Sequence, residues 1–103
     1  MRKRTKITLT FYTDPGHGWL KAPRSLLHEL GIENKVTSYS YVRNNDVFLE
    51  EDCDAGLLMD ALRQAGVAVT IKRQNTNKSS KIRSYGRYVQ PQQVAQAIQV
   101  RGY

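Results

Sequence analysis

The residues best suited to chemistry gather in the segment Asp14-Pro-Gly-His17-Gly-Trp19-Leu20. His17 can titrate near neutral pH, and Asp14 could orient it, a pairing found in acid–base sites. Further metal ligands or a nucleophile could come from one later cluster: Glu50, Glu51, Asp52, Cys53 and Asp54. No complete set of nucleophile, base and orienting group is visible, and the glycines match no nucleotide-binding fingerprint. We therefore expect no enzyme, no cofactor and no metal ion, with the loop forming a turn that Trp19 anchors to the core.

A second candidate is the basic and aromatic stretch from Lys78 to Tyr88. In an extended conformation its arginines would share a face with Tyr85, where guanidinium groups can clamp phosphates. The alternative is a solvated connector. We favour contact with nucleic acid, DNA or RNA, through residues near both ends of the chain: Arg2, Lys3, Arg4, Lys72, Arg73, Lys78, Lys81, Arg83, Tyr85 and Arg87.

A third candidate is an aromatic surface on the sheet face away from the helices, which could stack bases or contact a partner protein. The same rings could instead pack on one another, or beneath the C-terminal segment, as a second small core. We favour packing for Tyr41 and Phe48 and leave Tyr12 and Tyr39 open. The candidate partner-binding residues are Tyr12, His17, Trp19, Tyr39, Tyr41 and Phe48.

The distribution of charge supports a polyanionic partner. The 103 residues carry 16 Lys and Arg against nine Asp and Glu, a net charge of +7. All nine acids lie within residues 14–67, so both ends of the chain are purely basic. Such asymmetry is typical of proteins that bind nucleic acid, although basic ends can also serve solubility alone.

Periodicity predicts the first half of the fold. Apolar residues alternate from Ile7 to Tyr12, which predicts a strand, and residues 14–18 read as a loop. Pro23 suits the first turn of a short helix that ends at Gly31. Residues 36–51 read as a hairpin whose Asn44-Asn45 turn places Tyr41 opposite Phe48.

The second half begins with a helix that Asp52 caps and Gly66 ends. Residues 67–71 alternate as a last strand, residues 82–89 could add another, and Pro91 could open a helix with Val94, Ala97 and Ile98 facing inward. The order predicts a ferredoxin-like split β-α-β-β-α-β sandwich of α+β class. We expect a four-stranded antiparallel sheet with two helices on one face in residues 1–73, and a basic extension in residues 74–103 packed on or beside it.

Composition sets further limits. The single cysteine, Cys53, excludes an internal disulfide, and no apolar run is long enough to span a membrane. The basic N-terminus leads into a strand rather than an apolar signal region. We expect a single domain in the cytoplasm of a bacterial host, with no membrane partner. An exposed sheet edge or the aromatic face could support a homodimer.

Three segments carry a resemblance to known proteins: Asp14–Leu20, Tyr39-Ser-Tyr41, and Leu49-Glu-Glu-Asp-Cys-Asp-Ala55. They resemble shared segments of small uncharacterised proteins carried by phages and other bacterial mobile elements, over roughly residues 6–85. The resemblance carries no activity or site. It implies a genomic context in which small accessory proteins bind nucleic acid, or inhibit or retune a host or defence protein. Nucleic-acid binding is the leading expectation and an anti-defence effector is the alternative.

Overall fold

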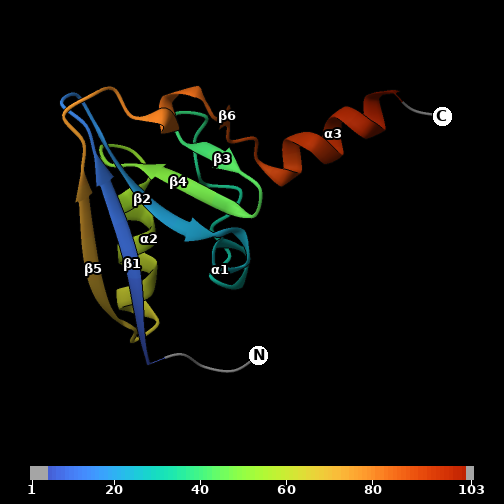
Figure 1. Ribbon diagram of the computed structural model, residues 1–103. Helices are drawn as coiled ribbons and strands as arrows, with labels where there is room; N and C mark the ends of the chain where they lie inside the picture. Colours follow the sequence, from blue (N-terminus) through green and yellow to red (C-terminus); the bar gives the residue numbers. More distant parts are fainter. Residues whose placement is uncertain (1–4, 102–103) are drawn as a thin grey trace.

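The chain forms one sheet with helices on one side of it (Figure 1). The computed structural model describes residues 5–101, and the side chains of residues 5–96. The strands are β1 Lys6–Thr13, β2 Gly18–Pro23, β3 Tyr41–Arg43, β4 Asp46–Glu50, β5 Ala68–Asn75 and β6 Gly86–Arg87. The helices are α1 Arg24–Glu29, α2 Ala55–Gln64, the 3-10 helix η1 Lys81–Ser84, and α3 Pro91–Arg101.

The sheet has six strands in the order β5-β1-β2-β4-β3-β6. All neighbouring strands are antiparallel except β1 and β5, which run parallel. Helix α2 provides the crossover that a parallel pair requires. Helices α1 and α2 lie against the same face of the sheet, and α3 projects away from the body of the molecule (Figure 1).

The predicted ferredoxin-like sandwich is wrong, because the sheet is six-stranded and mixed, with three α-helices. The main omission is β2, whose first residues were expected to be loop. Strand β2 lies between β1 and β4, and Trp19 and Leu20 are buried on its opposite faces. A strand covered on both faces has no apolar–polar alternation, so its sequence lacks the pattern by which a strand is recognised.

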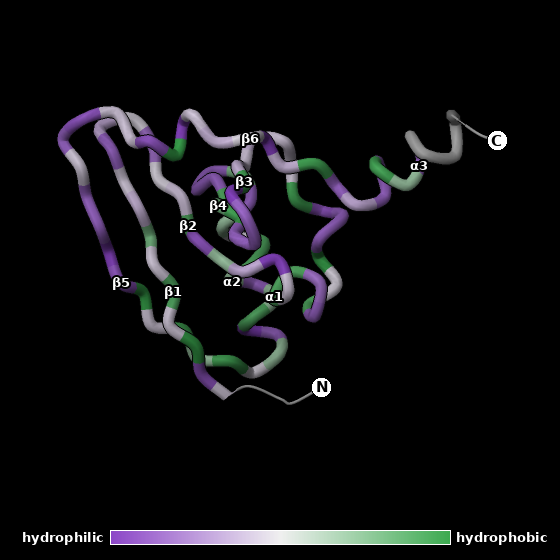
Figure 2. Tube along the Cα trace, turned by 45° about the vertical axis from the view of Figure 1, so that its right-hand side comes forward, coloured by the Kyte–Doolittle hydropathy of each residue, from purple (hydrophilic) through white to green (hydrophobic). Residues whose placement is uncertain are grey.

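The last predicted strand is confirmed as β5, but its pairing was wrong. It aligns in parallel with the whole of β1, from Lys6 opposite Ala68 to Thr13 opposite Asn75. Its outer edge is free among the described residues, since β5 ends the sheet. Figure 2 shows that the second half of β5 is strongly hydrophilic, which discourages pairing with another chain at this edge.

The main core lies between the sheet and the two helices. It contains the inward residues of the central strands and the apolar stripes of both helices, among them Leu9, Leu20, Leu26, Leu27, Val47, Leu49, Leu58 and Leu62. Within the described part of the chain, no helix is long and apolar enough to cross a bilayer.

Several local predictions are confirmed. Gly31 and Gly66 end their helices with positive φ angles of 70° and 75°, and Asn44 adopts a φ of 55° in the hairpin turn. Tyr41 lies opposite Phe48 as predicted, although β3 begins only at Tyr41 rather than at residue 36.

Two predicted details near α2 and α3 are wrong. Asp54 rather than Asp52 precedes α2, and its carboxylate turns away from the helix to accept hydrogen bonds from Thr37 and Ser40. Val94 is 49% exposed rather than inward, whereas the side chains of Ala97 and Ile98 lie outside the described residues.

Residues 76–88, called the crossing segment here, pass over the face of the sheet that the helices leave open (Figure 1). The extra strand considered for residues 82–89 is present only as two residues. The segment instead forms η1 and the two-residue strand β6, which pairs with β3. Ile82 of η1 is buried against the sheet, so this segment forms a second layer opposite the helices.

Candidate functional site

The open face of the sheet carries one row of residues that runs through all six strands. Because paired residues on neighbouring strands point to the same face, the registers align six side chains in order: Lys72, Thr10, Lys21, Phe48, Tyr41 and Arg87. The row is aromatic at its centre, where the crossing segment covers it, and cationic on both sides. The crossing segment therefore divides this face into two hollows.

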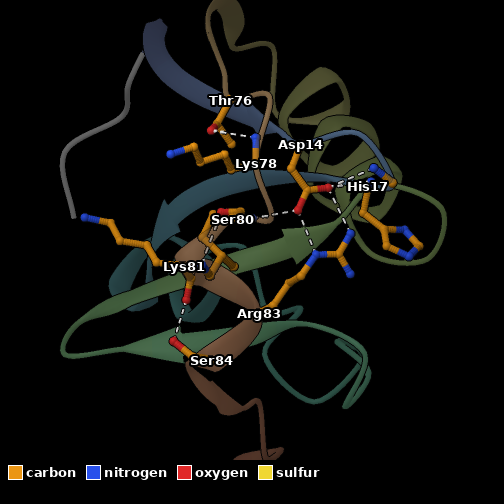
Figure 3. Close-up of polar contacts among 10 residues, drawn as sticks. Asp14, His17, Thr76, Lys78, Ser80, Lys81, Arg83 and Ser84 are labelled. Atoms are coloured by element: carbon orange, nitrogen blue, oxygen red, sulfur yellow. Dashed lines mark hydrogen bonds and ion pairs between the residues drawn. The ribbon is translucent and has the colours of Figure 1, made fainter.

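Asp14 holds the crossing segment in place (Figure 3). Its carboxylate accepts two hydrogen bonds from the Arg83 guanidinium, at 2.7 and 2.9 Å, and one of 2.8 Å from the backbone N–H of Ser80. The same carboxylate accepts the backbone N–H groups of Gly16 and His17. One acid therefore fastens the β1–β2 turn and the crossing segment together.

The electrostatics follow from this geometry. The Arg83 guanidinium, then the Ser80 N–H and the turn N–H groups, hold the pKa of Asp14 far below its usual value. The same ion pair raises the pKa of Arg83. The sequence left open that Asp14 could orient the His17 ring, but Asp14 hydrogen-bonds only to the backbone of His17 and forms its ion pair with Arg83.

Beneath the crossing segment lies the second small core that the aromatic residues had suggested as an alternative. Trp19, Phe48 and Ile82 are buried there, with Tyr12, Tyr41 and Tyr85 packed around them. The Phe48 ring centroid lies 5.2 Å from that of Tyr85 and 6.1 Å from that of Tyr12. Rings that pack on one another in this way are poorly placed to stack on bases. Tyr39, by contrast, is 63% exposed.

On one side of η1 lies a hollow that we call the basic groove, defined by five charged residues: Lys21, Arg43, Asp46, Lys78 and Lys81. It consists of two adjoining cavities of about 400 and 370 Å³, which share Tyr12 and Ser80 among their lining residues. Among the described residues, the only acid that lines it is Asp46, which is paired with Lys21 at 3.7 Å. Figure 3 shows the amino groups of Lys78 and Lys81 directed away from Asp14.

The structure distributes the predicted nucleic-acid residues unevenly. Lys78, Lys81 and Tyr85 line the basic groove, and Lys72 lies on the same face of the sheet. Arg73 points to the opposite face, where its guanidinium carbon lies 5.4 Å from the Phe11 ring centroid. Arg2, Lys3 and Arg4 lie outside the described residues.

The two remaining arginines are already engaged with the protein. Arg83 binds Asp14 and lies over the Trp19 ring. The Arg87 guanidinium carbon lies 4.5 Å from the Tyr41 ring centroid. A phosphate contact by either residue would compete with these interactions.

Lys21 and Arg43 were not among the predicted nucleic-acid residues. Lys21 belongs to the unrecognised strand β2, so its place beside the groove could not be inferred. Arg43 was placed near the aromatic face by the hairpin register, and it lies 5.1 Å from the Tyr85 ring centroid. A correct assignment of β2 would have placed Lys21 on this face.

On the other side of η1 lies a second hollow of about 400 Å³, called the histidine cleft here. Its lining combines acids, aromatic rings and the two engaged arginines: His17, Trp19, Tyr39, Tyr41, Glu50, Asp52, Cys53, Arg83 and Arg87. The pKa of the Cys53 thiol is raised, first by the protein around the sulfur and then by the charge of Glu50. Cys53 is therefore a poor nucleophile at neutral pH.

Comparisons with protein-family models, with curated proteins and with solved structures gave no significant match. The fold and the two hollows define the class directly: a small α+β domain with a six-stranded mixed sheet, helices on one face, and a crossing segment on the other that separates a basic groove from a histidine cleft.

Proposed function

We propose that this protein binds single-stranded nucleic acid through the basic groove, by contacts to the phosphate backbone. The observation that carries the proposal is the charge of the groove: four cations line it, and its only acid is paired with one of them. Cations grouped in this way release the counterions of a polyanion, which provides affinity without regard to sequence.

The geometry favours a single strand over a duplex. The basic groove is a concave hollow bounded by the sheet and the crossing segment, and each of its cavities has the size of a small-molecule pocket. A strand of nucleotides can lie in such a hollow, whereas the wide surface of a duplex cannot enter it. The basic groove therefore tracks a backbone in the manner of sequence-tolerant single-strand binders.

The aromatic residues take a supporting role in this proposal. Phe48 is buried, and Tyr85 has Arg43 over its ring. Phosphate contacts by Arg43, Lys78 and Lys81 would supply most of the affinity, with little preference among bases. The net charge of +7 and the resemblance to proteins of mobile elements agree with this function.

The test is fluorescence anisotropy with labelled single-stranded and duplex DNA and RNA at two salt concentrations, about 50 and 200 mM. We expect the single strands to bind more tightly and the affinity to fall steeply with salt. The double variant Lys78→Ala/Lys81→Ala should weaken binding and reduce the salt slope by about 1.4, since each phosphate contact to a single strand contributes about 0.7.

The control is the double variant Lys35→Ala/Arg63→Ala, which removes the same charge from exposed positions that do not line the groove. Equal binding by the two double variants would assign the affinity to net charge and reject the groove. Absence of binding by the unmodified protein at low salt would reject the function, and its capture of a host protein instead would support the effector alternative.

A further inference from the structure

The histidine cleft brings together three side chains that can ligate a metal ion. His17 comes from the β1–β2 turn, Glu50 from the end of β4, and Asp52 from the turn that follows. One donor atom from each lies within 4.8 Å of the others. Imidazole and carboxylate groups are the usual protein ligands of first-row divalent ions.

The backbone around His17 is well fixed. The N–H of Asp14 donates to the carbonyl of His17 at 2.9 Å, and the N–H of His17 donates to the Asp14 carboxylate at 3.0 Å. Arg83 also binds that carboxylate, so the β1–β2 turn that carries the imidazole has a defined geometry. Its ring centroid lies 6.1 Å from that of Trp19.

Glu50 is oriented by the chain that follows it. One of its carboxylate oxygens accepts the backbone N–H groups of Asp52 and Cys53, at 2.8 and 3.0 Å. The second oxygen accepts only a longer hydrogen bond of 3.3 Å from the Asp52 N–H, which leaves one of its lone pairs for a metal ion. Hydrogen bonds of this kind orient a ligand before the ion arrives and favour metal binding. The Asp52 carboxylate accepts no hydrogen bond within the described part of the chain.

The cleft also borders a buried donor that has no partner in the described part of the chain. Trp19 lines it and is 1% exposed, yet the indole N–H has no acceptor among the described residues. A buried donor without an acceptor is rare in proteins. Because the indole nitrogen is itself buried, a ligand oxygen could reach it only after the side chains around it move.

The charges around the cleft favour a cation at the three ligands. Asp14 neutralises Arg83, so the charges left in the cleft are the Arg87 cation, which donates to the carbonyls of Ser38 and Tyr39, and two carboxylates. The carboxylates of Glu50 and Asp52 belong to no ion pair among the described residues.

We propose that His17, Glu50 and Asp52 bind a divalent transition-metal ion of the Zn²⁺ class, with water completing the coordination. This differs from the expectation drawn from the sequence, which was that the protein binds no metal.

Ligand atoms in a tetrahedral zinc site lie about 3.3 Å apart, so the exposed His17 and Asp52 side chains must rotate to close the site. Mg²⁺ fits poorly, because it prefers an octahedral shell of oxygen ligands. The site is separate from the basic groove, so the metal-binding proposal does not depend on nucleic-acid binding.

Trp19 is the only tryptophan in the chain, so its fluorescence reports on this cleft directly. The experiment titrates the full-length, untagged protein with Co²⁺, a paramagnetic stand-in for Zn²⁺. It follows both the tryptophan emission and the visible absorption of the bound ion. We expect saturable quenching at one equivalent, reversal by Zn²⁺, and no effect of Mg²⁺.

Matched variants locate the site. His17→Ala and Asp52→Asn should each weaken Co²⁺ binding by about tenfold or more. His28→Ala and Glu51→Gln, which alter exposed residues outside the cluster, should leave binding unchanged. Circular dichroism establishes that each variant is folded. Because the Asp52 side chain is exposed and makes no hydrogen bond within the described residues, Asp52→Asn tests the site even if His17→Ala fails to fold.

Two outcomes would overturn the proposal. One is the absence of saturable quenching up to about 1 mM Co²⁺, the weak limit of specific binding. The other is equal affinity in Asp52→Asn and the unmodified protein, which would place the ion elsewhere.

Discussion

Arg83 and Asp14, 69 positions apart in the sequence, form a two-point ion pair in which the carboxylate side chain is only 1% exposed. This pair joins the β1–β2 turn to the crossing segment. The basic groove and the histidine cleft lie on either side of that segment, and His17 is mounted on that turn. Both candidate sites therefore depend on the Arg83–Asp14 ion pair, although this pair binds neither the proposed nucleic acid nor the proposed metal ion.

The first prediction is that Asp14→Asn loosens the crossing segment while leaving the helical layer intact. The amide cannot form a charged two-point contact with Arg83, and it accepts fewer N–H groups than the carboxylate. We expect trypsin cleavage after Lys78 and Lys81 to become faster by about tenfold or more, since hydrogen bonds to charged groups are the strong ones. Limited proteolysis followed by mass spectrometry measures this.

Asp60→Asn serves as its control, because Asp60 forms an exposed ion pair with Arg63 on α2. It should leave the cleavage rate unchanged. If Asp14→Asn were cleaved no faster than Asp60→Asn, the crossing segment would be held by its other contacts, among them the buried Ile82 and Tyr88 and the pairing of β6 with β3.

The second prediction concerns acid stability. The pKa of Asp14 lies far below the usual 3.8 in the folded protein, so the unfolded chain takes up this proton at a higher pH. The stabilisation is therefore fully present above about pH 4 to 5 and is lost as the pH falls below 3.8. The stability difference between the unmodified protein and Asp14→Asn should shrink as the pH is lowered.

Urea unfolding at a series of pH values from about 7 to about 3 measures that difference. The other carboxylates titrate in both proteins, so their contributions cancel in the comparison. A difference that stayed constant with pH would show that the carboxylate charge contributes nothing at this position.

The third prediction is that Asp54→Ala destabilises the fold by about 3 kcal/mol. Asp54 is buried and accepts hydrogen bonds from the backbone and hydroxyl of Thr37 and from the hydroxyl of Ser40. Its removal takes the acceptor from the buried Ser40 hydroxyl and from the half-buried donors of Thr37. Urea unfolding measures the loss, and Asp60→Ala on the exposed surface of α2 should change stability by less than about 0.5 kcal/mol.

The fourth prediction compares a glycine whose surroundings leave no room for a Cβ atom with one whose surroundings are open. Gly18→Ala should cost about 1–3 kcal/mol, because its Cβ would lie 2.5 Å from the ring of Phe11, which packs against the core. Gly56→Ala should stabilise the protein by about 0.5 kcal/mol, because α2 has open space there and alanine favours the helix. Thermal unfolding gives both values. A loss of stability in Gly56→Ala would show that α2 is constrained at its first turn by something other than helix propensity.

The elements that could be predicted are those whose signals lie within a few neighbouring residues. Strand β1, helices α1 and α2, and the hairpin around Asn44 were all visible as periodicity or turn chemistry. Strand β2 was not visible as periodicity, because Trp19 on one face and Leu20 on the other are both buried. The same omission removed Lys21 from the predicted binding residues.

The sequence by itself determined strand β1, helices α1 and α2, the helix ends at Gly31 and Gly66, and the concentration of positive charge in the last third of the chain. The tertiary structure alone decided that β5 pairs in parallel with β1, that Arg83 is engaged by Asp14, and that His17 meets Glu50 and Asp52. The physical reason is that helix periodicity and turn conformation depend on near neighbours in the chain. Strand pairing and ion pairing depend instead on which distant residues the completed core brings into contact.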